Sequence, residues 1–117
     1  MRRKLLMGNW KMNKTIAEAH EFATLTKDLI QVAKDNNIDI GVAPTFLSLD
    51  TVKKTSPELI VSAQNVHFKE NGAYTGEISI PMLKEIGIDV QILTLDMDTA
   101  DAYIWPDFDV ASGRDYD

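Results

Sequence analysis

The sequence has no cysteine in its 117 residues. That absence excludes a disulfide scaffold, a thiol nucleophile and a metal or iron–sulfur site held by cysteine. Long apolar runs are missing too, so we expect no segment that spans a bilayer. The basic residues Arg2, Arg3 and Lys4 are not followed by the apolar stretch and small-residue cleavage site of a signal peptide. We therefore expect a cytoplasmic protein with no membrane partner.

An excess of positive charge is also lacking, because 12 Lys and Arg residues stand against 18 Asp and Glu residues, a formal charge of −6. Nucleic-acid binding requires clustered Lys and Arg, so we expect no nucleic-acid partner. Residues 1–95 hold 11 basic and 11 acidic residues, whereas residues 96–117 hold seven aspartates and one arginine. This shift predicts a domain over 1–95 and an acidic, irregular C-terminal tail over 96–117.

Strand-like apolar runs alternate with helical patterns along the first 95 residues. The runs predict strands over 5–10, 38–43, 59–63 and 90–95, of which the first is a buried strand. Between the first two strands, a capping box predicts a helix of about five turns. That box consists of Thr15 and Glu18, and the apolar residues that recur at helical spacing after it are Phe22, Leu25, Leu29 and Val32.

Two more helices are expected, over 46–54 and after Ser79, which can cap a helix that ends before Gly87. A long polar loop over 64–77 precedes the last of them. The order predicts four parallel strands with three crossover helices in an α/β fold. Spacing alone leaves open whether these strands belong to an open doubly wound sheet or to a barrel.

Ligands of parallel α/β folds meet the carboxyl ends of the strands, where the first strand is followed by Lys11. A lysine ammonium there, with the Asn9 amide beside it, can bind a phosphate and stabilise developing oxyanion charge. A solvated loop lysine is the simpler interpretation of the spacing. We expect His20 on a helix face and His67 hydrogen-bonded to loop backbone, with no metal site at either.

Several motifs, in order and at matching separations, resemble the triosephosphate isomerase family over residues 4 to about 90. They are Gly8-Asn9-Trp10-Lys11-Met12-Asn13, Val42-Ala43-Pro44, Gln64-Asn65-Val66-His67 and Gly72-Ala73-Tyr74-Thr75-Gly76-Glu77-Ile78-Ser79. The resemblance implies a half β/α barrel over 1–95, since a complete eight-fold barrel needs about 250 residues.

The resemblance also implies a function: interconversion of dihydroxyacetone phosphate and glyceraldehyde 3-phosphate, in glycolysis and gluconeogenesis, without a cofactor. It implies that Asn9 and Lys11 bind the triose phosphate and that Lys11 supports the enediolate as a catalytic residue. By the same resemblance the third loop enters a partner subunit. The residues that would then lie at a homodimer interface are Gln64, Asn65, Thr75 and Glu77.

The sequence departs from the family after about residue 91. The family's fourth strand runs into Gly-His-Ser-Glu-Arg-Arg with the catalytic histidine, whereas residues 91–98 here read Gln-Ile-Leu-Thr-Leu-Asp-Met-Asp. The glutamate base would also lie in a later part of the family's barrel. We therefore expect negligible isomerase activity from this chain alone. Four barrel strands leave two open edges, so an alternative is a non-catalytic half-barrel that associates with itself.

The acidic end offers a third hypothesis. Asp96 and Asp98 follow an apolar strand, as the paired aspartates of haloacid-dehalogenase phosphatases do, and could bind Mg²⁺ in a phosphohydrolase-like site. The hydroxyl residue of that pattern is displaced, because Thr99 comes one position early. A solvated acidic tail is the simpler interpretation.

Overall fold

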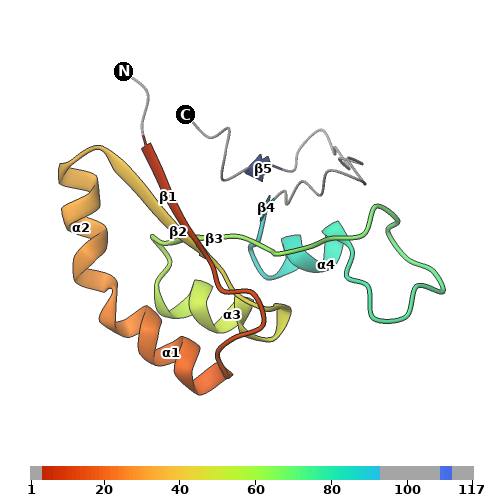
Figure 1. Cartoon of the computed structure of the whole chain (residues 1–117). Helices are drawn as coiled ribbons and strands as arrows, with labels where there is room; N and C mark the ends of the chain where they lie inside the picture. Colours follow the sequence, from red (N-terminus) through yellow and green to blue (C-terminus); the bar gives the residue numbers. More distant parts are fainter. Residues whose placement is uncertain (1–3, 93–108, 112–117) are drawn as a thin grey trace.

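The computed structural model describes residues 4–92 and 109–111 (Figure 1). Helices and strands alternate through most of it, which confirms the α/β class. In chain order the elements are β1 (Lys4–Asn9), α1 (Ile16–Leu25), α2 (Lys27–Asp35), β2 (Ile38–Ala43), α3 (Phe46–Thr55), β3 (Ile60–Val61), α4 (Ile80–Glu85), β4 (Val90–Ile92) and β5 (Asp109–Ala111). No helix in these residues is long and apolar enough to cross a membrane.

The sheet is parallel and has the order β1-β2-β3. Strand β2 pairs along its whole length with β1, from Lys4 opposite Ile38 to Asn9 opposite Ala43. Strand β3 is shorter than the predicted 59–63, but the Ala63 amide beyond it donates to the Val90 carbonyl of β4 at 2.8 Å. A parallel sheet of three strands is therefore present, and one hydrogen bond links it to β4.

Strand β5 corrects the expectation of an irregular tail. Asp109–Ala111 pair in parallel with Val90–Ile92, so three residues of the acidic segment form a strand. The physical reason is that an unpaired strand edge presents free N–H and C=O groups that another extended segment can satisfy. Residues 93–95, predicted to continue β4, lie outside the described residues.

The predicted five-turn helix is divided at Thr26 into α1 and α2, so four helices are described where three were expected. The Thr26 hydroxyl donates to the carbonyls of Phe22 and Ala23, at 3.0 and 3.2 Å, a back-bonding geometry that often bends helices. The start of α1 is as predicted: the Thr15 hydroxyl accepts from the Glu18 amide, and the Glu18 carboxylate accepts from the Thr15 amide.

The buried face of α1 and α2 differs from the predicted apolar stripe. Its buried positions are Ala19, Ala23, Thr26, Ile30 and Ala33, whose mostly small side chains let α1 pack close to α3 and α2 close to β2. By contrast, the side chains of Leu25, Leu29 and Val32 are 71, 56 and 57% exposed. The spacing identified a helix correctly, but it assigned the larger apolar residues to the wrong environment.

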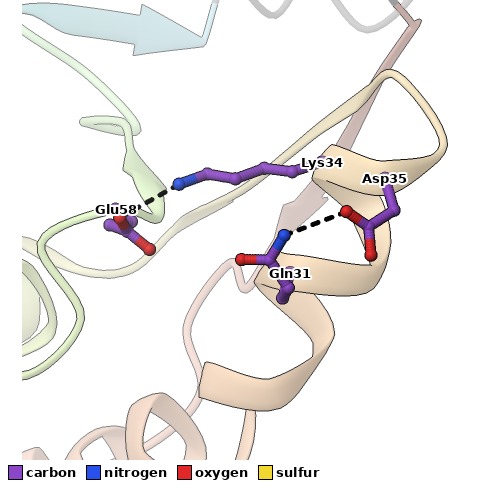
Figure 2. Close-up of polar contacts among 4 residues, drawn as sticks. All are labelled: Gln31, Lys34, Asp35 and Glu58. Atoms are coloured by element: carbon purple, nitrogen blue, oxygen red, sulfur yellow. Dashed lines mark hydrogen bonds and ion pairs between the residues drawn. The ribbon is translucent and has the colours of Figure 1, made fainter.

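The core lies between the sheet and the helices, with α3 closely packed on it. Leu49 and Val52 of α3 are fully buried, and the ring of Trp10 meets that of Phe22 edge-on at 5.0 Å. At the far end of α2, an ion pair of 3.0 Å joins Lys34 to Glu58 in the segment before β3 (Figure 2).

Strand β1 was expected to be buried, and this was wrong. Its residues are exposed or half-buried, and Leu6 is 69% exposed, because β1 pairs on one side only among the described strands. Beside it runs an apolar groove of about 540 Å³. The groove is lined from β1, β2, α1 and α2 by residues that include Leu6, Phe22, Leu29, Val32 and Ile40.

Candidate functional site

The carboxyl ends of β1, β2 and β3 meet at one side chain, that of Gln64. Its amide nitrogen donates to the carbonyl of Ala43, the last residue of β2, at 2.7 Å. The same nitrogen donates to the carbonyl of Lys11, two residues after β1, at 2.9 Å. Since Gln64 itself follows β3, one half-buried side chain ties all three strand ends together.

Lys11 has a backbone conformation that is uncommon outside glycine, with φ at 54°. Its amide donates to Oδ1 of Asn9 at 2.9 Å, and the carbonyl of the preceding Trp10 accepts from the Asn13 side chain at 2.7 Å. The Trp10 amide in turn donates to the Ala43 carbonyl at 3.1 Å. Three amide side chains, from Asn9, Asn13 and Gln64, therefore fix the backbone on both sides of Lys11.

This arrangement suits the binding of an anion. The Lys11 side chain is exposed, while the buried Trp10 anchors the turn that carries it. Lys14 is placed differently, because its ammonium lies 5.4 Å from the Trp10 ring centre and 5.5 Å from that of Phe22, where cation–π attraction holds it. Lys11 is thus an exposed cation at the carboxyl end of a parallel strand, the side of the sheet at which ligands of such folds bind.

The residues predicted at a subunit interface do not all lie together. Gln64 contacts Lys11 as described, and Asn65 beside it is exposed, with its side-chain oxygen accepting from the Val66 amide at 2.8 Å. Thr75 and Glu77 are exposed in the long loop between β3 and α4, which extends away from the sheet on the right of Figure 1. A long loop was predicted over 64–77, and the connection between β3 and α4 covers 62–79; Ser79 at its end caps α4 as expected.

The expectation for His67 was wrong in its partner. Its Nδ1 lies 3.3 Å from the Glu77 carboxylate, so the side chain pairs across the loop with an acid and not with loop backbone. Its ring also lies 4.2 Å from that of Tyr74. The reason is that the loop folds back on itself and brings Glu77 beside a position ten residues earlier. His20 is exposed on α1, as predicted.

Asp96 and Asp98, the proposed phosphohydrolase pair, lie outside the described residues. Within residues 4–92 and 109–111, no three His, Asp or Glu side chains gather where they could hold a metal ion.

Sequence reasoning singled out Asn9 and Lys11 at this strand end and named Gln64 only as an interface residue. It missed Asn13 and the bond between Gln64 and Lys11. Asn13 carried a local signal, since an asparagine three residues after a carbonyl can close a turn through its side chain. The Gln64 contact joins residues 53 apart in sequence, and it depends on the pairing register of the sheet.

Comparison with known proteins identifies a family for most of the chain. The triosephosphate isomerase family model matches residues 4–94. Triosephosphate isomerase of Clostridium beijerinckii is 46% identical over 95 residues, and that of Chlorobium phaeovibrioides is 42% identical over 96 residues. Both alignments cover 80% of this chain, which spans 37 and 38% of those relatives. The chain thus belongs to the triosephosphate isomerase family.

Proposed function

We propose that the strand-end site around Lys11 binds the phosphate of a triose phosphate, as the substrate site of an isomerase that needs no cofactor. The observation that carries this proposal is the exposed lysine on a strained backbone, fixed at the carboxyl ends of parallel strands. Ligands of such folds bind at that side of the sheet. The relatives at 42 to 46% identity bear the name of the isomerase.

The chemistry asked of Lys11 is electrostatic. Its ammonium would pair with the phosphate and would stabilise the negative charge that develops on the enediolate oxygen during proton transfer. Asn9 would bind the substrate and hold the Lys11 amide through its side-chain oxygen. Both roles are proposed from the family resemblance together with the contacts above.

We further propose that this chain alone has negligible isomerase activity, because proton transfer needs an acid–base pair that Lys11 does not supply. The sequence holds two histidines, His20 on the exposed face of α1 and His67 in the loop, and neither adjoins Lys11 in sequence or strand register. An assay that couples glyceraldehyde 3-phosphate turnover to a dehydrogenase tests this. Activity approaching that of a complete isomerase, and lost in Lys11→Met, would refute it.

Phosphate binding is tested separately by NMR titration with inorganic phosphate. We expect Lys11→Met to weaken binding by about tenfold or more, because charge-assisted hydrogen bonds contribute roughly 1.5–3 kcal/mol. Lys54→Met is the matched control. Lys54 is exposed and pairs with Asp50 at 3.1 Å. It lies in the last turn of α3, whereas the first turn of that helix follows the end of β2. Equal loss in both variants would show non-specific charge attraction and would refute the site.

In a dimer of the family type, the loop between β3 and α4 would contact the partner subunit in the cytoplasm. We propose Gln64, Asn65, Thr75 and Glu77 for this contact, and we propose that residues 1–95 form half of a β/α barrel. The exposure of Thr75 and Glu77 supports such a contact, although Glu77 also pairs with His67.

A second candidate function is self-association of a non-catalytic half-barrel. The apolar groove beside β1 favours it, because an exposed apolar surface next to a free strand edge is a site of association. Sedimentation at several concentrations tests it, with Leu29→Lys to place a charge in the groove. A compact monomer with a cooperative melt contradicts self-association, and an oligomer that Leu29→Lys leaves intact contradicts this surface.

A further inference from the structure

The Gln64 side chain uses both N–H groups of its amide on backbone carbonyls. One N–H meets the Ala43 carbonyl at 2.7 Å and the other meets that of Lys11 at 2.9 Å. Both partners are acceptors only, so the amide nitrogen and not the oxygen must face them. Only glutamine, among the side chains of this shape, offers two donors from one neutral nitrogen.

Lys11 needs such a partner because its backbone is strained. A non-glycine residue at φ 54° persists only where the surrounding structure fixes it. Asn9 fixes the amide side from two residues away, and this contact moves with the strand end itself. Gln64 fixes the Lys11 carbonyl from across the sheet. Because it also bonds to Ala43, it holds Lys11 at a fixed position relative to the end of β2.

We propose that Gln64 is a positioning residue for Lys11, holding the Lys11 backbone in its left-handed conformation and so presenting the ammonium to phosphate. This assigns Gln64 a role within its own subunit, besides any contact with a partner. It rests on the proposed function of Lys11 as the phosphate-binding cation. The conformational part, however, can be measured without any ligand.

Two substitutions separate the donors from the volume of the side chain. Gln64→Ala removes both donors and most of the side chain. Gln64→Glu keeps the shape, but the ionised carboxylate is acceptor-only and faces two carbonyls. Protonating the introduced carboxyl returns one O–H donor, so the positive φ of Lys11 should recover at acid pH in Gln64→Glu and not in Gln64→Ala.

Gln31→Ala is the matched control. Gln31 is exposed on α2, and its amide donates to Asp35 at 3.0 Å within the same helix (Figure 2). It loses the same side chain as Gln64→Ala without touching the strand ends.

The first readout is the Lys11 conformation in the full chain, followed by its intraresidue amide–Hα nuclear Overhauser effect, which is strong at positive φ. The second is the dissociation constant for inorganic phosphate, and the third is the urea midpoint. We expect Gln64→Ala to lose the positive-φ signature and to bind phosphate about tenfold more weakly, which corresponds to about 1.4 kcal/mol. Gln31→Ala should leave both the positive-φ signature of Lys11 and the dissociation constant for phosphate unchanged.

The outcomes distinguish the two proposals. If phosphate binds through Lys11 but Gln64→Ala and Gln64→Glu keep both the signature and the affinity, the positioning role is wrong and the phosphate site stands. If the native chain binds no phosphate yet Gln64→Ala loses the signature, the phosphate site is wrong and the conformational role stands. Should Gln64→Ala unfold, the acid recovery of Gln64→Glu decides, and a signature unchanged by pH overturns the proposal.

Discussion

Two parts of the helical cover, α3 and the pair of α1 and α2, differ in how their apolar residues are used. On α3, Leu49 and Val52 lie three residues apart, at helical spacing, and are fully buried. Along α1 and α2, Leu25, Leu29 and Val32 have the same spacing and are more than half exposed. The difference teaches that periodicity identifies a helix and its apolar residues, whereas burial depends on what packs against them, which periodicity does not contain.

The largest expected effect tests this comparison directly. Leu49→Ala should lower the free energy of unfolding by about 2–5 kcal/mol, because it opens a cavity in a packed core. Leu29→Ala, in the groove, should change it by no more than about 0.5 kcal/mol. Urea denaturation at equal protein concentration measures both. Similar losses in the two variants would mean that the groove is covered in solution.

An intermediate effect is expected at Gly41 of β2, in contrast to Gly8 on the neighbouring strand β1. A Cβ added at Gly41 of β2 would lie 2.7 Å from the Ile60 carbonyl oxygen and 2.8 Å from the Ile60 Cβ, so Gly41→Ala should cost about 1–3 kcal/mol.

Gly8→Ala on β1 is the control, since the nearest atom to its added Cβ is Val42 Cγ1 at 3.9 Å, an ordinary contact. We expect a change within about 0.5 kcal/mol in its thermal melt. A large loss there would show that something covers the outer side of β1.

The smallest effect concerns the capping box at the start of α1. Hydrogen bonds from the Thr15 amide and then the Thr15 hydroxyl hold the pKa of Glu18 below its ordinary value. Desolvation opposes this lowering, and the Lys14 charge adds to it. A lowered folded-state pKa stabilises the fold above the unfolded pKa, and this contribution is lost as the pH falls through the folded value. Thr15→Ala should raise the Glu18 pKa, as measured by carboxyl ¹³C titration. An unchanged pKa would show that the Thr15 hydroxyl contributes nothing to the lowering.

Much of the fold could be predicted from local signals. The capping box of Thr15 and Glu18 and the Ser79 cap each depend on residues within a few positions, and each prediction is confirmed. The division at Thr26 and the strand at Asp109–Ala111 were not predicted. The first depends on a hydroxyl bonding back to its own helix, and the second on the free edge of β4.

The main residues of the site could be predicted from the sequence, but the hydrogen bonds that join them could not. Lys11 and Asn9 stand out because a strand ends beside them, and the family resemblance added Gln64. That a single amide joins Gln64, Ala43 and Lys11 follows only from strand register, which the chain sets by packing over long separations. The pairing of His67 with Glu77 likewise needed the path of the loop.

The Ala43 carbonyl accepts two hydrogen bonds, and this has a consequence for the order in which the chain folds. It accepts hydrogen bonds from the Trp10 amide and the Gln64 side chain. The contacts that hold Lys11 therefore cannot all form until β3 has paired with β2. Contacts between residues so far apart along the chain form late, after shorter loops have closed. Competence to capture an anion should therefore be among the last properties that the molecule acquires as it folds.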